Sequence, residues 1–428
     1  MQSTLRPALL VIGSAIGATA LAQTPGLRPN VQTASPSAVA LDAQARFPSR
    51  LPSVLQPQVR TPVRAWKFNP ATIKLSPQSV ANLITAAINQ KFQGKSVGYS
   101  VTVIMPGGAS AEANGGMARR DPDSAPRGWT GNDRISIASV SKTITAATLI
   151  KLAAKRGVSL DSPAWKLLPP TWTYSPTFRD ITLRQLLAHN SGIRACGIDY
   201  DGLKACAAAG VKIADKNPGI PIWTKYSNAN YALMRLMIDQ LEDNAIPPTP
   251  TQQGGRYTML VNVNTLAPAG VGNQSCAPPA VNPALSYISA FDDNVWNSTA
   301  PQNYNWTKVL PGQPWGSMID VCGSQGWNLS SRQLATFVNA LMFTDKILPQ
   351  TTVEMMRDEG LGLMYFDFGG GLTAYGHGGY HPAPNNKGEV NTLILGFNNG
   401  ISVGLVINSR YKGSFSQDVA EAIRANAK

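Results

Sequence analysis

Charge is scarce in this sequence, and acidic charge is scarcer than basic charge. Only 14% of the 428 residues are charged, and 37 Lys and Arg against 24 Asp and Glu give a formal net charge of +13. This scarcity, together with a hydrophobic content of 43%, excludes an intrinsically disordered chain. The basic excess is spread along the chain without a basic run. It therefore argues against nucleic-acid binding and favours solubility or attraction to an anionic envelope polymer.

Long apolar runs are also missing beyond the first 22 residues. There, Arg6 precedes the apolar stretch Ala8–Ala20, and the small-x-small triplet Ala20-Leu21-Ala22 is typical of a cleavage site before Gln23. The apolar stretch is shorter than the roughly 20 residues that a membrane span needs. We therefore predict a cleaved signal peptide over 1–22 and a secreted or periplasmic protein without a stable membrane anchor. A retained anchor is the alternative.

Histidine is rare, and its spacing does not favour a metal site. The chain has only His189, His377 and His381, and no H-E-x-x-H pattern joins them. His377 and His381 are four apart, but Gly378 and Gly379 between them make a helix implausible. We expect neither a metal nor another cofactor.

Cysteine is limited to four residues, none of them in a C-x-x-C pair that would indicate zinc or redox chemistry. In an oxidising compartment they would pair, and three connectivities are possible. Pairing Cys196 with Cys206 and Cys276 with Cys322 requires the fewest topological assumptions. Four free thiols are the alternative.

Proline punctuates the chain between the predicted signal peptide and the first regular pattern. Residues 23–75 have neither a helical nor a strand period, which predicts a linker or an arm. Ser76-Pro77 is a helix N-cap followed by proline at the first helical position, so the folded domain is expected to cover 76–428.

Strand patterns lie at both ends of this domain, and helical patterns lie between them. Strands are expected over Tyr99–Met105, Ala109–Ala118, Leu361–Asp367, Val390–Phe397 and Ile401–Ile407, and helices over 139–156 and 414–427. We predict an α/β part over 76–158 and 343–428 and an inserted helical part over 159–342. A cleft should lie between the two parts.

The sequence Ser139-Val140-Ser141-Lys142 is an S-x-x-K motif at the expected start of a helix. One helical turn brings the lysine amine within reach of the serine hydroxyl, and a desolvated lysine can act as its base. Alone the motif is weak, because Ser141-Lys142 also fits a capped, solvated helix start.

Two further motifs carry the same chemistry. Tyr226-Ser227-Asn228 opens a predicted helix, and its phenol and amide suit proton transfer and substrate binding. His377-Gly378-Gly379 precedes Tyr380, and glycines beside a cleft let a substrate lie close to the backbone. Taken singly, each motif is more often a turn than a site.

The order and spacing of the three motifs resemble the class C β-lactamase and D-alanyl-D-alanine carboxypeptidase superfamily, a penicillin-binding-protein-like group that includes family VIII esterases. Three further stretches agree: Leu160–Pro163, Leu186–Gly192 and Gly326–Ser331 are similar to the family's "LDDP", "LLxHTSG" and "GGWxSS" segments. The resemblance covers nearly the whole mature chain. It implies an antiparallel sheet flanked by helices with an inserted helical domain.

The resemblance also implies catalytic roles. Ser139 would be the acylated nucleophile, Lys142 its general base and Tyr226 the partner acid and base. The backbone N–H groups of Ser139 and Tyr380 would form an oxyanion hole. His189, within the "LLxHTSG"-like turn, would be structural.

On the substrate side, the resemblance makes Asn228 a ligand of the substrate amide and places His377, Gly378 and Gly379 in the third motif. True class C β-lactamases usually have lysine where this chain has His377, so efficient β-lactam turnover is less expected. A histidine in the third motif, together with the motif Tyr226-Ser227-Asn228, resembles the pattern of the D-alanyl-D-alanine carboxypeptidase and mitochondrial-type peptidase branches.

The predicted protein is thus a monomeric, exported serine hydrolase that acts on a small-molecule or peptide amide or ester, such as one derived from the cell wall. We rank a peptidase or carboxypeptidase-like amidase first, an esterase second and a β-lactamase third. A non-catalytic penicillin-binding or sensor protein with the same cleft is the alternative from another class.

Overall fold

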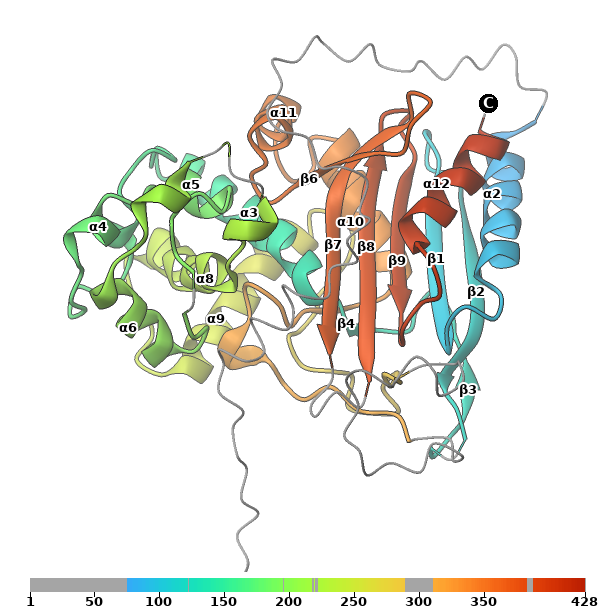
Figure 1. Cartoon of the computed structure of the whole chain (residues 1–428), viewed down its shortest axis with the longest axis horizontal. Coiled ribbons are helices and arrows are strands. Elements are labelled where there is room, and N and C mark those ends of the chain that lie inside the picture. Colours follow the sequence, from blue (N-terminus) through green and yellow to red (C-terminus); the bar gives the residue numbers. More distant parts are fainter. Residues whose placement is uncertain are drawn as a thin grey trace, which may run out of the picture. The chain divides into compact units, whose positions relative to one another are not determined.

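The computed structural model describes residues 75–427 apart from 122, 195, 218, 220–221, 289–310 and 383–387. The predicted signal peptide and all of the predicted arm except Leu75 lie outside the described residues. An antiparallel sheet of seven strands, in the order β3-β2-β1-β9-β8-β7-β6, forms the centre of this part of the chain (Figure 1). The strands are β1 (Gly98–Ile104), β2 (Ser110–Arg119), β3 (Arg127–Gly128), β6 (Met364–Asp367), β7 (Thr373–Pro382), β8 (Glu389–Phe397) and β9 (Ser402–Ile407).

The sheet joins the two ends of the domain, because β1 pairs with β9 in antiparallel register, with Val101 opposite Leu405. The strands expected from alternation correspond to β1, β2, β6, β8 and β9. Strand β7 was not among them. Gly376, Gly378 and Gly379 interrupt its alternation, and the pattern of glycines resembles a turn.

Two helices cover one face of the sheet. Helix α2 (Pro77–Phe92) begins at the expected cap, where the Ser76 side chain accepts from the N–H of Ser79, and α12 (Phe415–Asn426) begins after Ser414. Figure 1 shows the two helices side by side along this face. They enclose an apolar core with alternate residues of the strands, as the strand period requires.

Helix α10 (Ser331–Phe343) covers the opposite face, against β1, β8 and β9. A Cβ at Gly404 of β9 would lie 2.7 Å from the Cβ of Leu334, so glycine permits this close approach. The sequence analysis placed residues 331–342 in the helical part, but here they pack on the sheet. The side chains of Leu334, Val338 and Leu341 are fully buried.

Most of the remaining helices come, in the sequence, between β4 and β5, two short strands that pair with each other. These strands are Ile135–Ser136 and Asn328–Leu329. The helices and helical turns are η1 (Ala138–Val140), α3 (Ser141–Lys155), η2 (Ala164–Leu167), α4 (Pro176–Arg179), α5 (Leu183–Leu187), α6 (Tyr200–Ala209), η3 (Ile213–Lys216), α7 (Ile222–Lys225), α8 (Asn228–Asp243), α9 (Pro250–Val261), the π-helical η4 (Asn262–Leu266) and η6 (Ile319–Val321). Helix α11 (Gln350–Glu359) follows α10.

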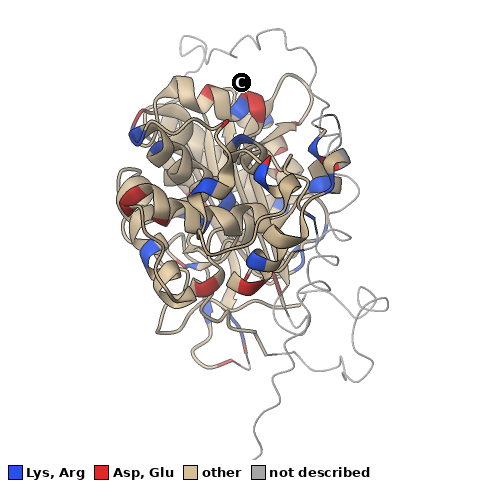
Figure 2. Ribbon diagram, turned by 90° about the vertical axis from the view of Figure 1, so that its left-hand side faces the viewer, with Lys and Arg blue, Asp and Glu red and all other residues tan. Residues whose placement is uncertain are grey.

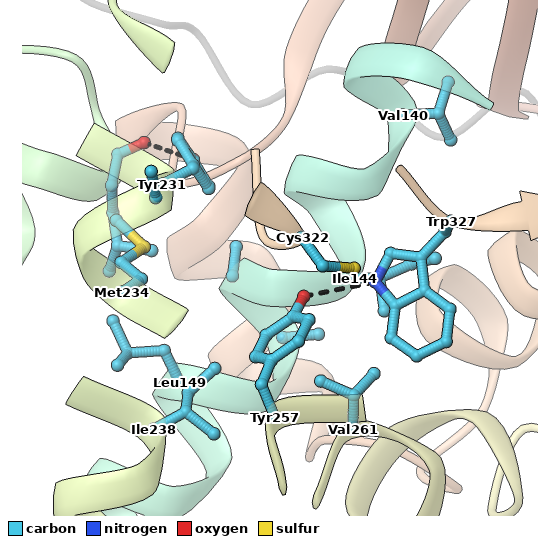
Figure 3. Packing of buried hydrophobic residues seen from close by; sticks show 14 of the residues in the cluster. Val140, Ile144, Leu149, Tyr231, Met234, Ile238, Tyr257, Val261, Cys322 and Trp327 are labelled. Carbon is cyan, nitrogen blue, oxygen red and sulfur yellow. Dashed lines mark hydrogen bonds between the residues drawn. The ribbon is translucent and has the colours of Figure 1, made fainter. Parts of the chain in front are cut away.

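The centre of this helical region is the packing of α3 against α8 and α9 (Figure 3). Ile144 and Leu149 of α3 face Ile238 of α8 and Tyr257 of α9, and all four side chains are fully buried. The Nε1–H of Trp327 donates to the Tyr257 hydroxyl over 3.1 Å. Burial of these apolar side chains fixes α3, and with it the residues at its start.

Two disulfides link the helical region. Cys196 is bonded to Cys206, and Cys276 is bonded to Cys322. These are the two sequence-local pairings that the sequence analysis placed first. Among the described helices, none is both long and apolar enough to cross a membrane.

Basic residues are scattered over the helical side of the molecule rather than gathered. Figure 2 shows Lys and Arg interspersed with Asp and Glu on this face. Several form surface ion pairs, such as Arg184 with Asp161 and Lys155 with Glu242. The distribution agrees with the absence of a basic run in the sequence.

Candidate active site

Ser139 lies in the tight turn η1, directly before α3, and its side chain is partly exposed. The preceding residue, Ala138, has a φ of 47°, a left-handed conformation that few residues with a Cβ adopt. Two contacts hold the backbone there: the N–H of Ile137 donates to the carbonyl of Trp327 over 2.8 Å, and the Thr392 hydroxyl donates to the carbonyl of Ile137 over 2.8 Å. Ser139 is therefore presented from a fixed turn.

Lys142 follows in the first turn of α3 and is fully buried. Its Nζ lies 3.0 Å from Ser139 Oγ, 2.7 Å from Asn228 Oδ1 and 2.7 Å from the carbonyl oxygen of Ser324. Burial holds the pKa of Lys142 well below its usual range. An amine that readily loses its proton beside a hydroxyl is the arrangement that activates a serine nucleophile.

Tyr226 and Asn228 reach the same point from the start of α8, where Ser227 is the N-cap. Lys142 Nζ lies 4.9 Å from the centre of the Tyr226 ring. Burial raises the pKa of the Tyr226 hydroxyl, and a hydrogen bond with Ser139 acts in the opposite direction. The phenol is therefore protonated at neutral pH and can give a proton to a group bound at Ser139.

His377 approaches Tyr226 from β7, with the two ring centres 6.4 Å apart. It is buried, and its Nδ1–H donates to the carbonyl of Gly378 over 2.6 Å. Burial, and secondarily an electrostatic effect of Lys142, lowers the pKa of His377 to about 3. The imidazole is consequently neutral at neutral pH.

Gly379 brings β7 against the turn that carries Ser139. A Cβ at Gly379 would lie 2.5 Å from the carbonyl oxygen of Ile137 and 3.2 Å from the Cβ of Ala138, closer than packing allows. A Cβ at Gly378 would meet nothing within 4 Å. The two glycines thus differ: one is needed for packing, and the other leaves space. Tyr380 follows on the same strand, opposite Asn391.

The structure brings Ser139, Lys142, Tyr226 and Asn228 into one cluster and places His377 beside it. Asn228, expected as a substrate ligand, also accepts a hydrogen bond from Lys142. The sequence analysis missed Ser324, which acts through its backbone carbonyl and so carries no side-chain signal. It also missed Thr392, although a hydroxyl within an otherwise largely apolar strand was a visible signal.

Within the described ranges, no three His, Cys, Asp or Glu side chains are grouped as metal ligands. His381, which the sequence analysis considered with His377, instead lies against Trp315, with the ring centres 4.7 Å apart.

A serine with a buried lysine one helical turn away, set between an antiparallel sheet and a helical region, defines a serine hydrolase of the S-x-x-K type. A model of the beta-lactamase family matches residues 80–428, and the chain belongs to this family.

Solved structures share the fold at low sequence identity. The D-amino acid amidase of Ochrobactrum anthropi SV3 in complex with D-phenylalanine is 22% identical with a TM-score of 0.61, and the match covers 81% of this chain and 99% of that one. A D-stereospecific amidohydrolase from Streptomyces sp. is 24% identical with a TM-score of 0.56, over 79% and 98%. The beta-lactamase/D-alanine carboxypeptidase of Pseudomonas syringae is 13% identical with a TM-score of 0.59, over 82% and 99%.

Proposed function

We propose that the protein is an exported acyl-serine amidase that hydrolyses a small amide or peptide of an amino acid, with Ser139 as the nucleophile. The observation that carries the proposal is the position of Lys142 Nζ, 3.0 Å from Ser139 Oγ and 2.7 Å from Asn228 Oδ1. Support for an amide as the substrate comes from two similar solved structures. One is named as a D-amino acid amidase and the other as a D-stereospecific amidohydrolase.

In the proposed acylation step, neutral Lys142 takes the proton of the Ser139 hydroxyl while Oγ bonds to the substrate carbonyl carbon. The negative charge that develops on the carbonyl oxygen is stabilised by the backbone N–H groups of Ser139 and Tyr380. The C–N bond then breaks, and the leaving amine receives a proton from Tyr226, which Lys142 reprotonates.

Deacylation runs through the same groups. Water gives a proton to neutral Lys142 and adds to the ester carbon, and the bond to Oγ breaks as Ser139 regains that proton. The products are a carboxylic acid and an amine, and water is the only co-reactant consumed. Neutral His377 beside Tyr226 adds no positive charge to this exchange.

Export is part of the proposal because of two independent features. The first 22 residues have the pattern of a signal peptide. All four cysteines are paired, as is typical of proteins that fold in an oxidising compartment.

The proposal is tested with amino-acid amides of both configurations, D-alanyl peptides, p-nitrophenyl esters and nitrocefin as substrates. We expect amide hydrolysis by the wild type, no turnover by Ser139→Ala, and turnover by Ser141→Ala. Ser141 is a matched control because it is a buried serine in the same segment and lies outside the cluster. Preferred turnover of esters would indicate an esterase instead. Binding without any turnover would favour a sensor protein.

A further inference from the structure

His189 ends the turn after α5 in a backbone conformation that few residues with a side chain adopt. Its φ is 56°, in the left-handed region, where glycine or asparagine is usual after a helix. Its side chain is nevertheless only 3% exposed. A histidine held in this conformation by its surroundings points to a function, and the contacts of its imidazole identify which one.

The imidazole lies flat against the ring of Tyr226. The two ring centres are 4.3 Å apart, and the ring planes differ by 28°. Tyr231 lies near the same imidazole, with its ring centre 5.1 Å away. Because the Tyr226 hydroxyl points along the plane of its own ring, a partner that fixes this plane also fixes where the hydroxyl reaches Ser139.

The same imidazole holds the start of α8. Its Nδ1 lies 3.2 Å from the backbone N of Ser227 and 3.0 Å from Asn230 Nδ2, both of which donate to it. The ring proton is therefore on Nε2. His189 thus joins the turn after α5 to the segment that carries both Tyr226 and Asn228.

Burial keeps His189 neutral. Burial is the main cause that lowers the pKa of His189 well below its usual range, and the electrostatic effects of Lys142, His377 and Lys225 act in the same direction. A neutral ring can stack on Tyr226 without adding a cation close to Lys142.

We propose that His189 is a positioning residue that holds the Tyr226 hydroxyl at Ser139, in the orientation needed to protonate the leaving group. This inference rests on the proposed acyl-serine function. It differs from the structural role that the motif resemblance implies, because it assigns the stacked ring an effect on the reaction rather than on folding alone.

Two substitutions separate the roles of the ring and of Nδ1. His189→Asn keeps an acceptor for Ser227 and Asn230 and suits the left-handed backbone, but it lacks the ring. His189→Phe keeps a ring against Tyr226 but removes the acceptor and strains the turn. We expect His189→Asn to be the more stable variant and His189→Phe the more active one per folded molecule. The predicted loss of kcat for His189→Asn on an amide is about 10- to 100-fold, with little change in KM.

If His189 only stabilised the fold, the order would be reversed: the less stable variant, His189→Phe, would also be the less active one. Thermal unfolding and active-site titration measure the folded fraction of each variant. An equal kcat per folded molecule in wild type and His189→Asn would overturn the proposal.

The second measurement is a double-mutant cycle. In a Tyr226→Phe background, His189→Asn is expected to cause no further loss of kcat, because the hydroxyl that it positions is gone. A control cycle uses Tyr231→Phe, which removes a hydroxyl that donates to the Leu187 carbonyl, and its effect should persist in the Tyr226→Phe background. A full additional loss from His189→Asn in that background would contradict positioning. Failure of the wild type to acylate on Ser139 would instead contradict the proposed function itself, which tells the two failures apart.

Discussion

Lys142 Nζ lies 2.7 Å from the carbonyl oxygen of Ser324 and 2.7 Å from Asn228 Oδ1. A neutral amine has two N–H donors and one lone pair. If these two acceptors take both donors, the lone pair remains for the Ser139 hydroxyl, 3.0 Å away. Ser324 and Asn228 therefore give the base its direction, and burial gives it its low pKa.

Lys142→Met is expected to lower the rate of acylation by about 10²- to 10⁴-fold, the usual contribution of a general base. Single-turnover kinetics with a chromogenic ester measure this rate. A matched variant, Lys151→Met, alters a lysine of the same helix whose Nζ donates to the carbonyl of Asn264, away from the cluster. An equal loss in both variants would contradict a specific role for Lys142.

The low pKa of Lys142 also predicts a dependence of stability on pH. Between the depressed pKa in the folded state and the usual value of 10.5, the unfolded chain binds the proton more tightly than the folded chain. The free energy of unfolding contributed by this group therefore rises with pH across that window. Urea unfolding of wild type and Lys142→Met is measured from pH 7 to 10. The free energy of unfolding of the wild type should rise relative to that of the variant as the pH increases. A constant difference would mean that the amine stays protonated in the folded protein.

Tyr226→Phe is expected to impair amides more than activated esters. An amine cannot leave without a proton, whereas p-nitrophenolate leaves as an anion and needs none from Tyr226. We predict a loss of about 10²-fold or more in kcat for an amino-acid amide, and a smaller loss in the acylation rate with a p-nitrophenyl ester. Equal losses for both substrates would remove Tyr226 from the leaving-group step.

Gly379→Ala and Gly378→Ala form a pair of neighbouring substitutions with opposite expectations. The Gly379 variant places a Cβ against Ile137 and Ala138 and should lower the free energy of unfolding by about 1–3 kcal/mol. The Gly378 variant meets nothing within 4 Å and should leave it within about 0.5 kcal/mol. If β7 contributes to substrate binding, the effect of the Gly378 variant should appear in KM. Chemical denaturation and steady-state kinetics measure the two effects.

The disulfides should contribute unequally to stability. The bond between Cys276 and Cys322 spans 46 residues, and that between Cys196 and Cys206 spans 10. Chain-entropy arguments assign about 4 kcal/mol to the longer loop and about 3 kcal/mol to the shorter one. Replacing each pair by alanine, followed by denaturation, checks the order. The longer loop should also matter for activity, since Ser324 follows Cys322 closely.

Side-chain patterns predicted most of this architecture. The cap at Ser76, the alternation of β1, β8 and β9 and the three motifs led to the sheet, the helices and the family. Strand β7 was not predicted from alternation, because its glycines remove the side chains on which the pattern depends. Gly379 shows one reason for a glycine in this strand: close packing against another segment, which only the folded structure reveals.

The candidate site was predicted from its motif residues, whereas Ser324 and Thr392, which lie outside the motifs, were missed. S-x-x-K and Y-S-N identified Ser139, Lys142, Tyr226 and Asn228, but every residue has a carbonyl, so nothing marked Ser324. His189 was visible as a motif residue, yet its stack on Tyr226 joins segments 37 positions apart. Only the three-dimensional arrangement connects the two.

The central claim is that Ser139 becomes acylated with Lys142 as its base. The direct measurement is intact-mass and peptide-mapping mass spectrometry after rapid acid quench of the enzyme with a slowly hydrolysed acylating agent. We predict one acyl group per chain, on the peptide that contains Ser139, slowed in Lys142→Met and absent in Ser139→Ala. An acyl group on another residue, or amide turnover by Ser139→Ala at the wild-type rate, would contradict the account.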